Sequence, residues 1–292
     1  MKIAVSGQRT IVDYISVLKP KETVLLTFIG VCSAIVAGGA FLPRDIFVLT
    51  LVALSLGSAG CNGLTNYLDR EVDARMMRTA NRALPAGRIV PAQKVLPLII
   101  CLLVAALVLA WLLHPFCFVF GLIGIVASAM WRKTASCTFL GIVAGCSPLL
   151  IGWFAISPEF DTRLLFLCSL VALWVPIHVW SVMVASRHDY LRAGLSYFPL
   201  NLPVQDVVRV LFVLSIFLYL VSILLYFVGG FHLVYLITAN ILGILITYAT
   251  ANLLLSRMST AAWRVYKLSA FPYLGVIFLA MCLDIWLLQN GH

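Results

Sequence analysis

The sequence predicts an all-α polytopic membrane protein with nine transmembrane helices. Its 292 residues are 63% hydrophobic and only 11% charged, and the mean hydropathy of +1.07 exceeds what a soluble domain can bury. A helix needs roughly 20 apolar residues to cross the hydrocarbon core of a bilayer, and such stretches recur along nearly the whole chain. A transmembrane β-barrel is excluded, because its strands would appear as short segments of alternating polarity.

Each predicted span is a continuous apolar run bounded by polar residues. In chain order the spans cover residues 23–42, 46–66, 95–113, 115–131, 137–156, 163–184, 207–229, 232–254 and 268–289. The three longest polar stretches, 67–94, 185–206 and 255–267, alternate with short connections such as the one around Gly229. No linker divides the chain, so we expect a single membrane-embedded domain over residues 1–292. The first ten residues lack an apolar core, and we expect no cleaved leader there.

The placement of Lys and Arg predicts the orientation in the membrane. With nine spans and a cytoplasmic amino terminus, all of the 20 basic residues except Arg44 and Arg163 fall on the cytoplasmic side. We therefore expect a multi-pass protein of the cell (inner) membrane, with its long polar loops in the cytoplasm. The net charge of +9 then reflects topology, and we expect no nucleic-acid partner because no basic soluble domain is present. Four tryptophans near predicted span ends suggest interfacial belts: Trp111, Trp131, Trp153 and Trp263.

The most charged stretch lies between the second and third spans. Residues 66–87 read N-Y-L-D-R-E-V-D-A-R-M-M-R-T-A-N-R-A-L-P-A-G. If the second span continues as a helix to residue 73, a step of about 100° per residue places four polar side chains on one stripe. These are Asn62, Asn66, Asp69 and Asp73. Two carboxylates one turn apart repel each other, so we expect a cation between them.

Oxygen ligands of this kind suit Mg²⁺, which often shares its coordination shell with substrate phosphates. Arg78 and Arg82 follow the acids, and guanidinium groups bind phosphate oxygens in pairs. We therefore predict a diphosphate site in which Asp69 and Asp73 hold Mg²⁺, with Asn66 or Asn62 as an amide ligand. The alternative is a solvated loop whose arginines only anchor the topology.

These residues carry a resemblance to a known family. N-x-x-D-x-x-x-D followed by M-x-R-T-x-x-R-x-L-P-x-G resembles the first signature of the UbiA-type intramembrane prenyltransferases. That resemblance implies a nine-helix bundle that binds prenyl diphosphates through Mg²⁺, with Asp69 and Asp73 as catalytic residues. The family usually has Asn four residues before the first Asp, where this chain has Thr65.

A second stretch, residues 174–199, narrows the resemblance to one branch of the family. Pro176, His178 and Trp180, then D-Y-x-x-A-G from Asp189, are similar to the pattern of the protoheme IX farnesyltransferase branch. Residues 14–21 and 131–153 agree with that branch, so the likeness covers most of 14–200. The second D-x-x-x-D of many family members is broken, because Ala185 stands four residues before Asp189. Further departures are Ala83, Ser147 and Ile177, each at a position where the branch usually has proline.

The resemblance implies transfer of a farnesyl group from farnesyl diphosphate to the vinyl group of heme b within the lipid bilayer. It also implies a possible link to a downstream heme A synthase or to terminal oxidase assembly. A UbiA-type enzyme for another acceptor, a quinone precursor or a chlorin, is the first alternative. A carrier or assembly factor without catalysis is the second.

Several further residues are candidates for the site. Ionisable residues within spans suggest function, so we expect His178 to ligate heme iron or to accept a proton from water, unless it only bonds a neighbouring helix. Arg132, Lys133 and Lys19 could contact the diphosphate or serve as topology anchors. Asp189, beside Tyr190, could complete a second cation site or pair with an arginine. The sequence leaves these alternatives open.

Overall fold

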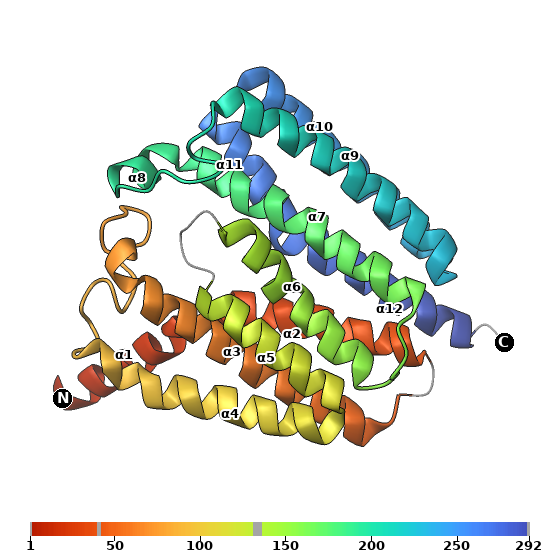
Figure 1. The fold of residues 1–292 in the computed structure, drawn as a ribbon, viewed down its shortest axis with the longest axis horizontal. Coiled ribbons are helices and arrows are strands. Elements are labelled where there is room, and N and C mark those ends of the chain that lie inside the picture. The colour runs from red at the N-terminus through yellow and green to blue at the C-terminus, as the bar shows by residue number, and fades with distance from the viewer. Residues whose placement is uncertain (1, 40–41, 131–135, 291–292) are drawn as a thin grey trace.

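The computed structural model describes residues 2–39, 42–130 and 136–290, which form a bundle of long helices without strands (Figure 1). The helices are α1 (Lys2–Val17), α2 (Pro20–Gly38), α3 (Arg44–Asp73), α4 (Leu96–Leu113), α5 (Pro115–Met130), α6 (Cys137–Phe154), α7 (Thr162–Ala185), α8 (Arg187–Arg192), α9 (Val204–Gly229), α10 (Leu233–Ser256), α11 (Ser259–Leu268) and α12 (Leu274–Asn290). A 3₁₀ turn, η1 (Ala92–Val95), precedes α4, and a π-helical turn, η2 (Ser269–Tyr273), joins α11 to α12.

The all-α membrane fold is confirmed, and most of the predicted spans are found. Among the described residues, eight helical segments are long and apolar enough to cross a membrane. The helix at the fourth predicted span, α5, is apolar but has 16 residues. The count of nine crossings, and the side on which the amino terminus lies, therefore stay predictions.

Local chemistry explains where the helices begin and end. Helix α3 continues to Asp73, as expected for the polar stripe. Helix α2 is displaced from the predicted 23–42, because Pro20 suits the first helical position and Gly39 leaves the helix with a φ of 58°. The predicted span 268–289 begins at the last residue of α11 and includes η2. In η2, Ala270 has a non-helical ψ of −133° and Pro272 follows, so the chain kinks between α11 and α12.

The helices are arranged as a ring. Helix α2 contacts α6, and contacts continue through α7, α9, α10 and α12 back to α2. Helices α3, α4 and α5 pack beside α2 and α6 (Figure 1). Neighbours in the ring thus include helices far apart in the sequence.

Small residues allow α2 and α6 to touch through their backbones. A Cβ atom on Gly152 would lie 1.9 Å from the carbonyl oxygen of Gly30, so any larger residue at 152 would separate the helices. The Ser33 hydroxyl donates to the carbonyl oxygen of Leu149 at 2.9 Å in the same interface. Close backbone approach of this kind is how transmembrane helices associate without a hydrophobic driving force.

The expectation of an interfacial belt is wrong for Trp153. Its side chain is fully buried, its Nε1 donates to the carbonyl oxygen of Glu159 at 2.9 Å, and the Arg163 guanidinium lies 5.2 Å from its ring centroid. Trp111 is 58% exposed, as a belt residue should be. Trp131 lies outside the described residues. Position near a span end does not reveal whether an aromatic ring faces lipid or the bundle interior.

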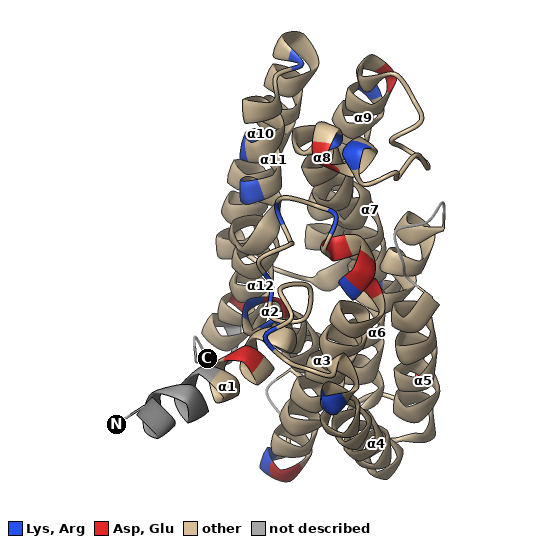
Figure 2. Cartoon of the chain, turned by 90° about the vertical axis from the view of Figure 1, so that its left-hand side faces the viewer, with Lys and Arg blue, Asp and Glu red and all other residues tan. Residues whose placement is uncertain are grey.

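Polar connections gather at one end of the bundle. The turn between α1 and α2, the loop 74–91 and α8 lie at the end where the amino terminus is found, and the carboxyl terminus lies at the opposite end (Figure 1). Viewed from that side, many of the Lys, Arg, Asp and Glu residues cluster around the loop 74–91 and α8 (Figure 2). We call this region the polar end.

Candidate active site

An internal cavity of about 370 Å³ reaches into the bundle from the polar end. Its walls come from α2 to α7, with Tyr266 of α11 completing one side. The charged lining residues come from the turn before α2, the first turn of α2, the end of α3 and the loop 74–91, all at the polar end: Lys19, Glu22, Asp69 and Arg82. The rest of the lining is largely apolar. The cavity therefore combines a charged opening with a hydrocarbon-like interior.

Small side chains on α3 to α6 create the space. The residues concerned are Ala53, Gly57, Ala106, Ala110, Gly121, Gly124, Gly141, Ala144 and Gly145. Protein interiors are otherwise close-packed, so a row of Gly and Ala on four facing helices leaves a void that an apolar ligand can fill.

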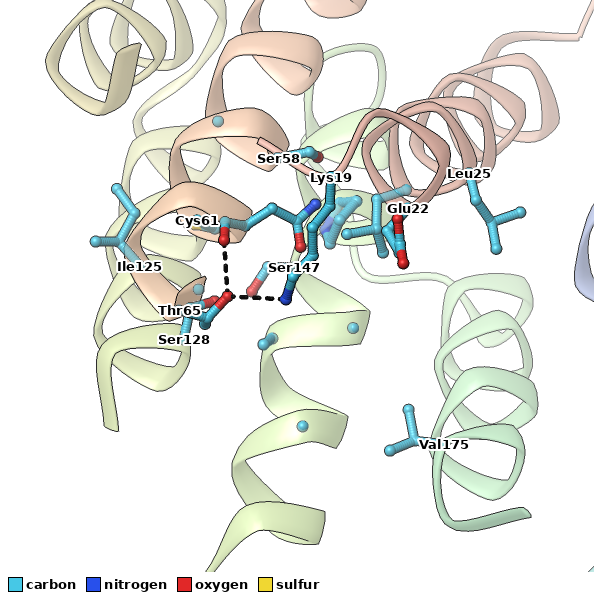
Figure 3. Close-up of a pocket in the computed structure, with 18 of the residues that line it drawn as sticks. Lys19, Glu22, Leu25, Ser58, Cys61, Thr65, Ile125, Ser128, Ser147 and Val175 are labelled. Carbon is cyan, nitrogen blue, oxygen red and sulfur yellow. Dashed lines mark hydrogen bonds between the residues drawn. The ribbon is translucent and has the colours of Figure 1, made fainter. Parts of the chain in front are cut away.

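Lys19 reaches into the cavity from the start of α2. Its backbone has a φ of 47°, a left-handed conformation that costs a non-glycine residue about 1–2 kcal/mol. Its Nζ donates to Thr65 Oγ1 at 3.4 Å, and Thr65 Oγ1 donates to the carbonyl oxygen of Asn62 at 2.9 Å (Figure 3). Burial, reinforced by the nearby Arg82 guanidinium, lowers the pKa of Lys19 from 10.5 to about 8. The amine is thus an ammonium at neutral pH but close to titrating.

The two acids of the predicted stripe occupy different positions. Asp69 lines the cavity. Asp73 is 1% exposed and lies behind the lining, where its Oδ2 accepts from Arg82 Nη1 at 2.8 Å. Arg82 itself lines the cavity. Asp69 and Asp73 both act electrostatically on Lys19, so Lys19 and Arg82 supply part of the positive charge expected between the acids.

The two candidate amide ligands, Asn62 and Asn66, line different pockets. Asn62 lines the cavity, and its Nδ2 donates to Thr23 Oγ1 at 3.0 Å. Asn66 is buried, and its Nδ2 donates to the carbonyl oxygen of Val17 at 2.6 Å. Asn66 lines a neighbouring pocket rather than the cavity. Asn62 is therefore the better placed of the two to meet a ligand beside Asp69.

Asp189 connects α8 to the loop 74–91. Its Oδ1 accepts from the backbone N–H of Met77 at 2.7 Å, and its Oδ2 accepts from that of Arg78 at 3.1 Å. The Arg78 side chain donates from Nη2 to the hydroxyl of Tyr190 at 3.5 Å. Tyr190 lines the cavity, and burial raises the pKa of its hydroxyl while Arg78 opposes that rise. Asp189 thus holds the arginine-bearing loop against the second polar segment.

His178 lines the cavity farther from the charged opening. Its ring is stacked between Trp174, at 4.8 Å between centroids, and Tyr266, at 4.6 Å. Its Nδ1 shares a hydrogen bond with Ser269 Oγ at 3.1 Å. These contacts fix the plane of the ring and leave its Nε2 edge for another partner.

Two predicted residues cannot be placed, and several residues near the cavity were not predicted. Arg132 and Lys133 lie outside the described residues. Trp174 could have been recognised from the sequence, because it stands one helical turn before His178. Tyr266 and Ser269 could not, since nothing in the sequence places α11 and η2 against α7. Tyr197, whose pKa is raised by burial, also lines the cavity without any sequence motif of its own.

Fold and site together define a polytopic α-helical membrane protein with an internal apolar cavity that opens among charged groups. Residues 23–280 match the model of the UbiA prenyltransferase family. The chain belongs to this family, and it is a prenyltransferase.

Curated relatives and solved structures agree with this assignment. The chain is 34% identical to "Protoheme IX farnesyltransferase" of Desulforudis audaxviator, covering 94% of this chain and 88% of that protein. It is 33% identical to the protein of the same name from Symbiobacterium thermophilum, covering 96% of each. A digeranylgeranylglyceryl phosphate synthase has the same fold, with a TM-score of 0.77 and 18% identity over 95% of this chain and 99% of that one. A UbiA homologue from Archaeoglobus fulgidus bound to GPP and Mg²⁺ gives a TM-score of 0.63 and 15% identity over 92% and 99%.

Proposed function

We propose that this protein, as one membrane-embedded domain, transfers a farnesyl group from farnesyl diphosphate to a vinyl group of protoheme IX. The proposal is supported by the names of curated relatives that match nearly the whole chain at 33–34% identity. It is also supported by the P-x-H-x-W and D-Y-x-x-A-G stretches, which bring His178, Asp189 and Tyr190 to the site. The polar end would face the cytoplasm, where the charged diphosphate is available.

The observation that carries the proposal is the division of the cavity into a charged opening and an apolar interior. Lys19, Asp69 and Arg82 line the opening, and Leu25, Leu54 and many small residues line the interior. An allylic diphosphate has the same division, with an anionic head and a hydrocarbon tail. The head would lie at the polar end, and the tail would extend between α3, α4, α5 and α6.

The residues at the opening fit a magnesium ion. Asp69 offers a carboxylate and Asn62 an amide oxygen, and both are hard oxygen donors. The described residues contain no cluster of three or more His, Cys, Asp or Glu that could bind a metal without further ligands, so oxygens of the diphosphate would have to complete the shell. When bound, Mg²⁺ would supply a Lewis acid that stabilises the leaving diphosphate.

The chain's own residues would stabilise the anion that forms when the allylic C–O bond breaks. Arg82, held by Asp73, and the Lys19 ammonium line the cavity and would face the negative charge as it develops, and fixed charges of this kind lower the barrier most. Arg78 and Tyr190 would hold the loop side of the diphosphate, with Lys133 and Arg132 as proposed further contacts. The apolar walls would keep bulk water from the allylic cation.

The bond-making step would join this cation to the heme vinyl group. The terminal vinyl carbon forms the new C–C bond, water adds to the adjacent carbon, and one proton is released with the diphosphate as product. His178 would ligate the heme iron or accept the proton from water through its Nε2. Its ring is fixed for this by Trp174, Tyr266 and the bond to Ser269. Transfer to another acceptor, a quinone precursor or a chlorin, is the alternative.

Membranes containing the protein, incubated with labelled farnesyl diphosphate and either heme b or an aromatic acid, test the proposal. We expect a labelled heme in which one vinyl group has become a hydroxyethylfarnesyl group, heavier by one farnesyl group and one hydroxyl group, detected by mass analysis of the extracted hemes. The label should depend on Mg²⁺ and should not appear in the aromatic acid. A product formed only from the aromatic acid would end the heme assignment and leave prenyl transfer standing.

A further inference from the structure

A second pocket shares Lys19, Glu22 and Arg82 with the main cavity. It has a volume of about 340 Å³ and is formed by the end of α1, the start of α2 and residues 82–88. Four of its lining residues are basic: Lys19, Lys21, Arg82 and Arg88. The one acid among the lining residues is Glu22. Such an excess of positive charge in a concave site attracts anions.

The basic groups of this pocket are positioned by the protein. Arg88 Nε donates to Asp13 Oδ1 at 2.7 Å, and its Nη1 donates to the carbonyl oxygen of Asn81 at 2.9 Å. A guanidinium carries five donor N–H groups, so these contacts orient Arg88 and leave donors for a ligand. Arg82 is oriented in the same way by Asp73.

The pocket also contains the amino-terminal end of α2. Pro20 and Lys21, in the first turn of this 19-residue helix, both line it. The first N–H groups of a helix have no acceptor within the helix, and together with the helix dipole they favour phosphate groups. Three features thus converge here: a concave site, four basic side chains and a helix start.

We propose that this second pocket is a binding site for a phosphate group, separate from the site where the prenyl group is transferred. Two sources have this chemistry. One is diphosphate released in the main cavity, because Lys19 and Arg82 line both spaces and the anion could pass from one to the other. The other is the phosphate of an anionic lipid headgroup, one without a cationic group of its own, at the membrane surface. The first source rests on the proposed function, and the second does not.

Binding of inorganic diphosphate to the purified full chain tests the proposal. We would measure it by calorimetry in nanodiscs of phosphatidylcholine, first with EDTA and then with Mg²⁺. The wild type should bind diphosphate without Mg²⁺, and Lys21→Gln combined with Arg88→Gln should weaken this binding at least tenfold. Lys21→Gln alone should give a partial loss of diphosphate binding. The Lys21 side chain is exposed, so this variant leaves the Arg88 contacts intact. Asp69→Asn should keep the Mg²⁺-independent binding while it loses prenyl transfer.

Nanodiscs of phosphatidylglycerol distinguish the two sources. If the lipid headgroup occupies the pocket, this lipid should weaken diphosphate binding to the wild type but not to the double variant. If free diphosphate is the ligand, the affinity should be the same in both lipids. Mg²⁺-independent binding that is absent in phosphatidylcholine, or equal in the wild type and the double variant, overturns the proposal. Because Asp69→Asn and the labelled-product assay report on the main cavity, a failure here is distinct from a failure of the proposed function.

Discussion

Asp69 and Asp73 are the side chains on which the proposed chemistry depends most. Asp69 lines the cavity, whereas Asp73 holds Arg82 at 2.8 Å. Asp69→Asn or Asp73→Asn should reduce prenyl transfer by at least about 100-fold, the scale on which removing a group that stabilises developing charge slows catalysis. Product formed from labelled farnesyl diphosphate by purified protein measures this.

A matched control for these variants lies on the same helix. Glu71 is exposed and pairs with its neighbour Arg70, at 2.8 Å. Glu71→Gln should retain activity within about twofold, since exposed ion pairs contribute little. Near-normal product from an Asp69→Asn, Asp73→Asn double variant would remove the acids from the mechanism.

Lys19 should make substrate binding depend on pH. Its pKa of about 8 means that the amine is protonated at pH 7 and loses its charge as the pH rises through 8. Binding of an anionic diphosphate should therefore weaken with rising pH, and the KM should increase by about tenfold between pH 7 and 9. Lys19→Arg keeps its charge throughout this range, so its KM should change little. An identical pH profile in wild type and Lys19→Arg would show that another group titrates.

The sequence indicated these residues because they lie close together in the chain. Asp69 and Asp73 could be found because α3 continues through the polar stripe without a break. The same stripe could not distinguish Asn62 from Asn66. A helical wheel does not show that Asn62 lines the main cavity and Asn66 the second pocket, with Lys19 lining both. The contact of Asp189 with the Met77 amide joins residues 112 positions apart, and a single sequence carries no information on such a pairing.

At the scale of helices, small residues on α3 to α6 determine the depth of the cavity. Gly57 lines it, and a Cβ there would meet only the Ala106 Cβ, at 3.5 Å. Gly57→Leu should extend a larger side chain into the space of the prenyl tail. The kcat/KM for farnesyl diphosphate should fall at least about tenfold, while shorter geranyl diphosphate should be less affected, because overfilling a packed space costs about 1–3 kcal/mol.

Ser55 provides the control for this change. It lies on the same helix outside the cavity lining, and its hydroxyl bonds the carbonyl oxygen of Leu51 in the preceding turn. Ser55→Leu should leave the ratio of the two kcat/KM values unchanged. If Gly57→Leu also leaves that ratio unchanged, the tail does not lie between α3 and α4.

Hydropathy predicted the long helices well but not their interruptions. Apolar runs placed α4, α9 and α10 to within a few residues. The end of α2 at Gly39 and the kink at Ala270 depend on backbone torsion angles that an average over many residues conceals. The kink shapes the candidate site, since Tyr266 and Ser269 beside it contact His178.

At the scale of the whole molecule, the ring of helices separates two chemistries. Charged side chains gather at the polar end, and the cavity walls beyond them are largely apolar (Figures 2 and 3). A diphosphate can therefore be bound at the membrane surface while its hydrocarbon tail stays within the bundle. In the proposed function, the same basic residues would serve both orientation in the membrane and anion binding.

The position of the termini leads to a prediction about this orientation. The amino and carboxyl termini lie at opposite ends of the bundle (Figure 1), which requires an odd number of crossings. The polar end carries most of the basic loops, so we expect it to face the cytoplasm.

Alkaline phosphatase, active only outside the cytoplasm, should be active when fused after Asn290 and inactive when fused after Asn201, between α8 and α9. Green fluorescent protein at the same two positions should give the inverse result. Phosphatase activity at Asn201 alone would reverse the orientation, and equal activity at both positions would require an even number of crossings between them.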